Sequence, residues 1–159
     1  MPGLGKLPVV TDGARRTIEL ESEYTSKQIL DMADHVYDLH DIGASIASGT
    51  FKTEGMVVVP CSMKTVAGIH SGYSDNLLLR AADVTLKERR KLVLVARETP
   101  LHTIHLRNMM ELSQMGAIIL PPMLTFYNRP ENIQQMVEHI AAKVLDIYGI
   151  ESKKFRRWS

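Results

Sequence analysis

Three short runs of apolar residues recur through the middle of the chain, at 55–60, 92–96 and 116–120. Each has the length of a β-strand and lacks the alternation of polar and apolar residues that a half-exposed strand shows. Runs of this kind are typical of parallel strands that are covered on both faces. The hydrophobic pattern therefore predicts a buried parallel sheet.

Segments with helical periodicity alternate with these runs. Helices are expected over 14–22 and 26–33, after a cap at Ser74, after Pro100, and from about residue 130 to residue 149. The apolar residues expected to face the core are Leu77, Leu78, Ala81 and Ala82 in the third helix, Leu101, Ile104, Leu112 and Met115 in the fourth, and Ile133, Met136, Val137, Ile140, Val144 and Ile147 in the last. The alternation predicts an α/β fold, a three-layer Rossmann-like or flavodoxin-like parallel sheet flanked by helices, in a single domain over 1–159.

The composition restricts the partners that the surface can attract. Nineteen basic residues against eighteen acidic ones give a formal net charge of +1, so the chain has no general attraction for nucleic acid or anionic membranes. Cys61 is the single cysteine, which excludes an intramolecular disulfide and fits a reducing, cytoplasmic compartment. No apolar run approaches the roughly 20 residues that span a bilayer. The basic segment 151–159 is expected to be a solvated tail or to dock on a neighbouring chain.

The expected sheet also predicts where a ligand binds. In parallel α/β sheets, ligands lie outside the carboxyl ends of the strands. The three strands would lead to 61–65, to Arg97 and Glu98, and to Tyr127. We therefore expect polar and charged groups from distant parts of the chain to converge on one rim of the sheet. The small, polar segment 43–50 is expected to be a loop that approaches a ligand closely.

Five blocks of the sequence carry a resemblance to a known family. They are ARRTIELE (14–21), SIASGTFKTEGMVVVPCSMKT (45–65), the stretch 72–109 that contains LKERR and RETPL, MGAIILPPMLTFYNRP (115–130), and the last helix. In this order they resemble the UbiX-type flavin prenyltransferases, which include one of the components of the bacterial phenolic acid decarboxylases. The resemblance covers nearly all of residues 9–150.

The resemblance implies a specific group transfer. Members of the family move a dimethylallyl group from dimethylallyl monophosphate to N5 and C6 of reduced FMN without a metal. The product, prenylated FMN, serves a UbiD-type decarboxylase, and similarity to the phenolic acid enzymes implies that this partner acts on hydroxyarylic acids. Family members also form homo-oligomers, and the resemblance implies a dodecamer.

The resemblance also assigns site residues. Those implied for flavin binding are Ser48, Gly49, Ser62, Met63, Lys64, Thr65 and Arg80. Those implied for the prenyl phosphate are Lys87, Arg97, Glu98, Tyr127 and Lys143, of which Tyr127 and Lys143 can serve an adjacent protomer. Lys87, Arg97 and Glu98 are the candidate catalytic residues, because fixed cations stabilise a departing phosphate and a carboxylate beside them can transfer a proton.

Some of these residues also have ordinary structural explanations. Arg97 and Glu98 can form a surface ion pair, which contributes little to stability. Lys143 lies at the edge of an apolar stripe and can simply extend its ammonium group into solvent. Tyr127, in a loop bounded by prolines, can be a packing residue. For these positions, the family resemblance and the structural explanation make different predictions.

The sequence favours neither a catalytic cysteine nor a metal site built from histidines. Cys61 has no histidine or aspartate at a spacing that specifies a thiolate nucleophile, so a small buried residue is the preferred interpretation. His102 and His105 lie close enough on one helix to share a metal ion, but no second pair of ligands accompanies them. We therefore expect no metal site.

Residues 1–10 depart from the family pattern. Members begin with a strand, a GxTGASG-like loop that binds the flavin phosphate, and a helix, none of which this sequence shows. Instead LPVVTDGARR (7–16) aligns with the second strand and the turn after it, with Thr11 and Asp12 in place of a serine and a lysine. An exposed strand edge and weaker flavin binding are therefore expected. The alternative function is an assembly or binding module of the same family with impaired flavin binding; a flavin-dependent cysteine decarboxylase is disfavoured by LKERR and RETPL.

Overall fold

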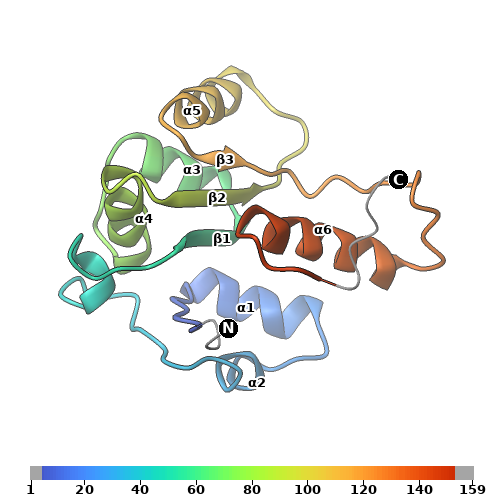
Figure 1. The fold of residues 1–159 in the computed structure, drawn as a ribbon, viewed down its shortest axis with the longest axis horizontal. Coiled ribbons are helices and arrows are strands. Elements are labelled where there is room, and N and C mark those ends of the chain that lie inside the picture. Colours follow the sequence, from blue (N-terminus) through green and yellow to red (C-terminus); the bar gives the residue numbers. More distant parts are fainter. Residues whose placement is uncertain (1–4, 153–159) are drawn as a thin grey trace.

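A parallel sheet of three strands forms the centre of the computed structural model, which describes residues 5–152. Strand β1 (Gly55–Cys61) pairs with β2 (Lys91–Ala96), and β2 pairs with β3 (Ile118–Ile119), so the order is β1-β2-β3. Both pairings are parallel, with Val57 opposite Val93 in the first. The predicted parallel α/β fold is confirmed (Figure 1). The expected basic tail lies largely outside the described residues, since 153–159 are not among them.

Helices fill the connections between the strands and flank the sheet. α1 (Asp12–Glu21), α2 (Ser26–Leu30) and the 3-10 helix η1 (Ser45–Ala47) precede β1. α3 (Met63–His70) and α4 (Leu77–Lys87) connect β1 to β2, α5 (Thr103–Gln114) connects β2 to β3, and α6 (Ile133–Ile147) follows β3. α3 packs against both α4 and α5, while α1 and α2 contact each other on the β1 side of the view in Figure 1. None of the helices within residues 5–152 has the length and hydrophobicity of a membrane span.

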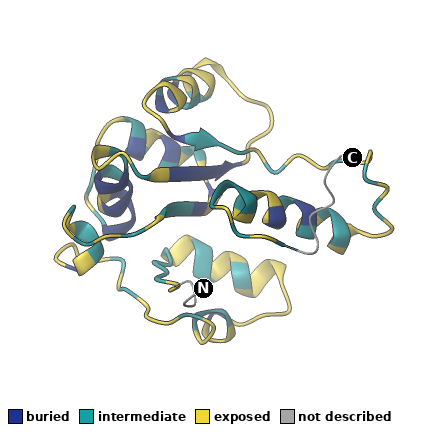
Figure 2. Ribbon diagram, in the orientation of Figure 1, coloured by how far each residue is buried: buried dark blue, intermediate teal, exposed yellow. Residues whose placement is uncertain are grey.

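The core lies between β2 and the helices on either side of it in sequence. Leu92, Val93 and Leu94 of β2 have no exposed surface, and Leu77 of α4 and Leu112 of α5 are equally buried. Burying one side chain of this size contributes about 1.5–3 kcal/mol to stability. In Figure 2 the buried residues accordingly gather in β2, α3 and α4. The apolar face predicted for α4 is confirmed, since Leu77, Leu78, Ala81 and Ala82 are all buried.

β1 forms one edge of the sheet, in agreement with the expected exposed strand edge. Within the described residues it pairs with β2 alone. Val58 is 5% exposed but Val59 is 65% exposed, so β1 is not covered on both faces as its apolar sequence predicted. The segment before α1 that was expected to be a strand makes an isolated bridge between Val9 and Tyr37. An apolar edge of this kind can pair with a further strand.

Asparagine side chains set the first residues of α4 and α6. The Asn76 side chain accepts a hydrogen bond from the Leu79 amide at 3.0 Å, so Asn76 and not Ser74 is the cap of α4. The Asn132 side chain likewise accepts from the Gln135 amide at 2.9 Å at the start of α6. The predicted starts lay slightly too early, because asparagine satisfies a first-turn amide as well as serine does and here lies closer to the first apolar residue.

Two other elements are shorter than their sequence patterns predicted. α2 ends at Leu30 rather than at 33, because the amides of Met32 and Ala33 bond to carbonyl groups three residues back in tight turns. β3 covers two residues rather than 116–120. Gly116 has a φ of 105°, a left-handed conformation that turns the chain before the strand begins.

The apolar faces predicted for α5 and α6 are partly exposed. Asn108 and Leu112 are the buried residues of α5, and His139 and Ala142 are those of α6. The predicted core residues that are instead exposed are Leu101, Ile104, Met115, Ile133 and Val137. α5 packs against both α3 and β3, so its buried face differs from the stripe that periodicity alone predicted. Exposed apolar side chains in such number are typical of surfaces that bind another protein.

The end of α6 is fastened to the amino ends of β1 and β2. The Tyr148 hydroxyl donates to the Met56 carbonyl at 2.8 Å and to the Lys91 carbonyl at 3.2 Å. Lys91 Nζ in turn donates to the Ile147 carbonyl at 2.8 Å. Gly55 leaves room for the ring, because a Cβ at this position would lie 2.8 Å from Tyr148 Cε1. α6 is therefore held to the sheet by its last turn.

Replacing Tyr148 with Phe keeps the ring and removes the hydroxyl. The carbonyl groups of Met56 and Lys91 would lose a donor, so we expect Tyr148→Phe to lower the free energy of unfolding by about 1–3 kcal/mol. Urea unfolding followed by circular dichroism measures the change. The matched control is Tyr73→Phe, at a residue 60% exposed, which should leave the midpoint unchanged. Equal midpoints for both variants would show that the hydroxyl does not fasten α6.

The pH dependence of stability reports separately on the burial of the Tyr148 side chain. Burial raises the pKa of Tyr148 from 10.0 to about 12, so folding favours the neutral phenol. The stability that comes from this shift is present below pH 10.0 and is lost as the pH rises toward about 12. Over this range the wild-type chain should lose more stability than Tyr148→Phe.

Candidate functional site

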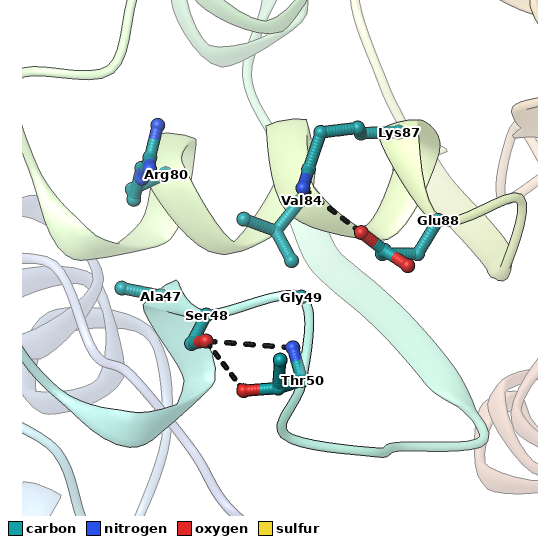
Figure 3. Close-up of a pocket in the computed structure, with 8 residues that line it drawn as sticks. All are labelled: Ala47, Ser48, Gly49, Thr50, Arg80, Val84, Lys87 and Glu88. Carbon is teal, nitrogen blue, oxygen red and sulfur yellow. Dashed lines mark hydrogen bonds and ion pairs between the residues drawn. The ribbon is translucent and has the colours of Figure 1, made fainter.

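A pocket of about 430 Å³ lies between α4 and the segment 47–50 (Figure 3). Four of the site residues named from the sequence line it, and they are Ser48, Gly49, Arg80 and Lys87. α4 also contributes Val84 to this wall, and Glu88 follows directly after its last turn. The structure therefore brings together residues that are about thirty to forty positions apart in the sequence.

The sequence of α4 explains why one helix serves both the core and the pocket. Arg80, Val84 and Lys87 recur at the spacing that places residues on one helix face. Leu78 and Ala82, on a different face, belong to the hydrophobic core. Packing of the apolar face against the sheet thus directs the charged residues of α4 toward the segment 47–50.

The cations of the pocket are partly neutralised by neighbouring carboxylates. Lys87 Nζ lies 2.8 Å from Glu88 Oε1, and Arg80 Nη1 lies 3.7 Å from Asp83 Oδ2. The hydrogen bond and charge of Lys87 lower the pKa of Glu88, and the charge of Arg90 acts in the same direction. Exposed pairs of this kind are weak, so an anionic ligand can compete with Glu88 for Lys87.

The wall opposite α4 is built from small and hydroxylated residues. Ser48 Oγ lies 2.8 Å from Thr50 Oγ1, a hydrogen bond that Figure 3 also marks. A Cβ on Gly49 would come within 3.1 Å of Lys87 Nζ and closer still to the Glu88 carboxylate. Glycine therefore allows the loop to approach the charged end of α4. Thr50 and Glu88 were not among the site residues predicted from the sequence, although both adjoin residues that were.

A second group of predicted residues lies at the carboxyl end of β1. Ser62 caps α3, and its Oγ accepts a hydrogen bond from the Thr65 amide at 3.2 Å and lies 3.1 Å from Thr65 Oγ1. Met63 and Lys64 occupy the first turn of the same helix. Hydroxyl groups, helix amides and a lysine at one helix N-terminus form a set of donors suited to an anion such as a phosphate.

A third group follows the carboxyl end of β2. Arg97 and Glu98 are both exposed, and no ion pair joins them in the described structure. Glu98 Oε1 accepts a hydrogen bond from the Thr99 amide at 3.0 Å. The interpretation of these residues as a surface ion pair is therefore wrong. Their charged groups face solvent at the end of the most buried strand.

Tyr127 and Lys143 come from the last part of the chain. Tyr127 is 59% exposed, and its ring meets the ring of His139 edge to face with centroids 6.2 Å apart. Lys143 Nζ lies 3.4 Å from Asp146 Oδ2 on the same helix. Neither residue is buried in the core, so both side chains remain accessible to a ligand or a neighbouring chain.

Lys87 and Glu98 lie at opposite ends of β2. Lys87 ends the helix that leads into the strand, and Glu98 follows the strand's last residue. The six residues of the strand are separated by five steps of about 3.3 Å each, so roughly 17 Å separates its two ends. The expected single rim of one chain can hold the groups around Ser62 and Arg97 but not Lys87. Lys87 was assigned through the family resemblance and not to a strand end, and it lies apart from this rim because the turn after α4 lies at the amino end of the sheet.

Cys61, His102 and His105 have structural roles. Burial raises the pKa of the Cys61 thiol from 9.0 to about 12, so it stays protonated at neutral pH, as the small-residue interpretation requires. His102 Nδ1 accepts a hydrogen bond from the Ile104 amide at 3.2 Å and caps α5, and its ring stacks on that of His105. Among residues 5–152, no three His, Cys, Asp or Glu side chains are grouped so that they could hold a metal ion.

Comparison with known proteins identifies the family. Residues 9–146 match the Flavoprotein family. A protein of Sedimentibacter hydroxybenzoicus described as "Probable UbiX-like flavin prenyltransferase" is 51% identical over 150 residues, which cover 94% of this chain and 79% of that protein. This chain belongs to the UbiX-like flavin prenyltransferase family.

Solved structures of UbiX-like proteins have the same fold. The dodecameric FMN-dependent UbiX-like decarboxylase of Escherichia coli O157:H7 matches with a TM-score of 0.97 and 52% identity, over 100% of this chain and 86% of that one. AnUbiX in complex with FMN and dimethylallyl pyrophosphate matches with a TM-score of 0.95 and 46% identity, over 96% of this chain and 81% of that one.

The UbiX-like motifs fall on the three groups of residues described above. LKERR (86–90) ends α4 and forms part of the pocket, CSMKT (61–65) ends β1 and begins α3, and RETPL (97–101) follows β2. The hydroxyls and helix amides of CSMKT, together with Lys64, Lys87 and Arg97, fit a flavin that carries a phosphate.

Proposed function

We propose that this UbiX-like chain transfers a dimethylallyl group from dimethylallyl monophosphate to N5 and C6 of reduced FMN, which makes prenylated FMN. The observation that carries the proposal is the 51% identity to a flavin prenyltransferase relative over 94% of the chain. Reduced FMN supplies the nucleophilic ring atoms, and the protein supplies the charges that hold the phosphate and accept a proton. No metal takes part in this proposal.

The first turn of α3 is proposed to hold the flavin. Ser62 and Thr65 offer hydroxyl groups beside helix amides, and Lys64 adds a positive charge. Met63 would pack against the ring system. Ser48, Gly49 and Arg80 are proposed as further flavin contacts from the pocket. These donors favour the anionic end of the ligand, because helix amides and cations stabilise negative charge.

The prenyl phosphate is proposed to bind Lys87, Arg97, Tyr127 and Lys143. Fixed cations and a phenol stabilise the phosphate as it leaves, since charge placed in advance acts most strongly on the charge that develops. Glu98 is proposed to transfer the proton that the substituted C6 loses, or to return one to the phosphate. Its exposed position at the end of β2 leaves the carboxylate accessible for this role.

The site is proposed to combine residues of neighbouring copies. Since roughly 17 Å separates the two ends of a six-residue strand, we propose that a site that uses both Lys87 and Glu98 draws them from two chains. Met123, Phe126 and Ile133 are 72%, 68% and 75% exposed, and such exposed apolar side chains support self-assembly. The similar Escherichia coli protein is dodecameric. We propose a homo-oligomer, and a dodecamer in particular.

The product is proposed to serve a UbiD-type decarboxylase that acts on hydroxyarylic acids. Prenylated FMN is a modified cofactor, so an enzyme that makes it requires a recipient that uses it. A cytoplasmic location is proposed because the single cysteine, Cys61, is a free, buried thiol, as in proteins of reducing compartments.

Mass spectrometry tests the proposed reaction directly. Purified protein is incubated anaerobically with reduced FMN and dimethylallyl monophosphate, with the diphosphate in a parallel reaction. The expected result is a flavin that carries one additional five-carbon unit, formed from the monophosphate. The absence of any adduct would contradict the proposal. If a parallel fluorescence titration also showed no flavin binding, the alternative of an assembly or binding module would be supported.

A further inference from the structure

Arg90 joins α4 to the loop on the other side of the pocket. Its Nη1 donates to the Phe51 carbonyl at 2.8 Å, and its Nη2 donates to the Gly49 carbonyl at 2.6 Å. The two acceptors are main-chain atoms that lie about forty residues earlier in the sequence. One guanidinium group therefore fixes two points of a loop that has no strand or α-helix of its own.

The backbone around Arg90 is itself fixed. Arg89 has a φ of 56°, and the Arg90 amide donates to the Thr85 carbonyl at 2.9 Å, which is the hydrogen-bond pattern of a Schellman motif at the end of α4. The next residue, Lys91, begins β2. Arg90 is thus held between a helix end and the central strand, so its planar guanidinium is presented in one direction with little loss of freedom.

The loop that Arg90 holds supplies one wall of the pocket. Ser48, Gly49 and Thr50 line the cavity opposite Arg80 and Lys87 (Figure 3). The Arg90 side chain itself is not among the residues that line it. Because both of its described bonds are to loop carbonyl groups, Arg90 acts on the shape of the pocket and not on the ligand directly.

We propose that Arg90 is a positioning residue, which sets the distance between the 48–51 loop and α4 at which the pocket accepts its anionic ligand. The proposal rests on the proposed function, in which this pocket supplies Ser48, Gly49, Arg80 and Lys87 to the site. Lysine is a poor replacement for the arginine, because its three N–H donors share one nitrogen and cannot reproduce two donor nitrogens held apart in a planar fork. Without the fork, the loop carbonyls lose their charged donor and the loop moves independently of α4.

The test compares Arg90→Lys with Arg89→Lys, which makes the same chemical change one residue earlier, where no described side-chain bond is lost. Hydrogen exchange followed by mass spectrometry measures the amides of 48–52. We expect exchange there to rise by about tenfold or more in Arg90→Lys, the scale of losing hydrogen bonds from a charged donor. Arg89→Lys should match the wild type, and exchange in β2 should be unchanged in both variants.

Kinetics supply a readout that general loss of stability would not give. In Arg90→Lys the KM for reduced FMN, the ligand proposed to contact Ser48 and Gly49, should rise by about tenfold, while kcat stays within about twofold of the wild-type value. In Arg90→Ala, millimolar guanidinium chloride should restore the lower KM, because the free cation can occupy the space of the missing group. A lysine variant with wild-type loop exchange, or with a wild-type KM, would overturn the proposal.

The two proposals fail in different ways. If the wild-type chain forms no flavin adduct, the proposed reaction is wrong, and the exchange of 48–52 still decides whether Arg90 holds the loop. If the wild type is active and Arg90→Lys behaves like Arg89→Lys, the reaction stands and the role of Arg90 is wrong.

Discussion

Glu98→Gln should reduce prenyl transfer by roughly a hundredfold or more while the chain remains folded, because the amide cannot take up the proton in transfer. The substitution is nearly isosteric, and Glu98 is exposed, so no core contact is lost. Glutamine can still accept the hydrogen bond that the Thr99 amide donates to Glu98 at 3.0 Å, which preserves the turn after β2. The rate of adduct formation under saturating substrates measures the effect.

The control for this substitution is Glu54→Gln. Glu54 is also exposed, lies in the loop before β1, and loses the same single charge. It should leave the transfer rate unchanged. Flavin affinity, measured by fluorescence, should be similar in both variants. A Glu98→Gln protein with the wild-type rate would remove this carboxylate from the proposed mechanism.

Two inactive variants should restore activity to each other when they assemble together. Lys87→Met removes the ammonium group near the amino end of β2, and Glu98→Gln removes the carboxylate beyond its carboxyl end. One site is proposed to draw these two residues from different copies of the chain. In co-expressed protein with random mixing, about one quarter of the sites would combine an intact Lys87 with an intact Glu98. Transfer activity should therefore return to about that fraction of the wild-type value.

The matched control pairs Glu98→Gln with Arg97→Met. Arg97 and Glu98 are adjacent in sequence and lie at the same end of β2, so every copy in this mixture carries a defective rim. No activity should return. If the Lys87 and Glu98 variants also fail to complement each other, although size-exclusion chromatography shows mixed oligomers, the shared site is contradicted.

Features that depend on a few consecutive residues were predictable. The run of apolar residues in β2 gave a fully buried strand, and the spacing of Leu77, Leu78, Ala81 and Ala82 gave the buried face of α4. The CSMKT block was correctly placed directly after a strand, although the helix α3 that Ser62 caps was not predicted. In each case the periodicity or the capping side chain lies within the element that it determines.

Features that depend on which helices and strands pack against one another were not predictable from the sequence. Val59 belongs to an apolar strand and is nevertheless exposed, because β1 lies at the edge of the sheet. Ile104 and Ile133 fit the helical spacing of apolar residues but are exposed, because each lies outside the face with which its helix packs against the rest of the described structure. The sequence pattern shows that a helix or strand has an apolar face. It does not show whether that face packs against the same chain or against another chain.

The sequence by itself determined the parallel α/β fold, the family and the residue types proposed for a flavin and a phosphate, because these follow from local periodicity and from motifs that are continuous in the chain. Tertiary structure alone decided that Ser48 and Gly49 face Arg80 and Lys87 across one pocket, and that Lys87 and Glu98 lie at opposite ends of β2. The physical reason is that these positions depend on the turn after α4 and on the two hydrogen bonds from Arg90 to the loop about forty residues earlier. The spacing of residues within a motif determines neither the direction of a turn nor a contact between distant segments.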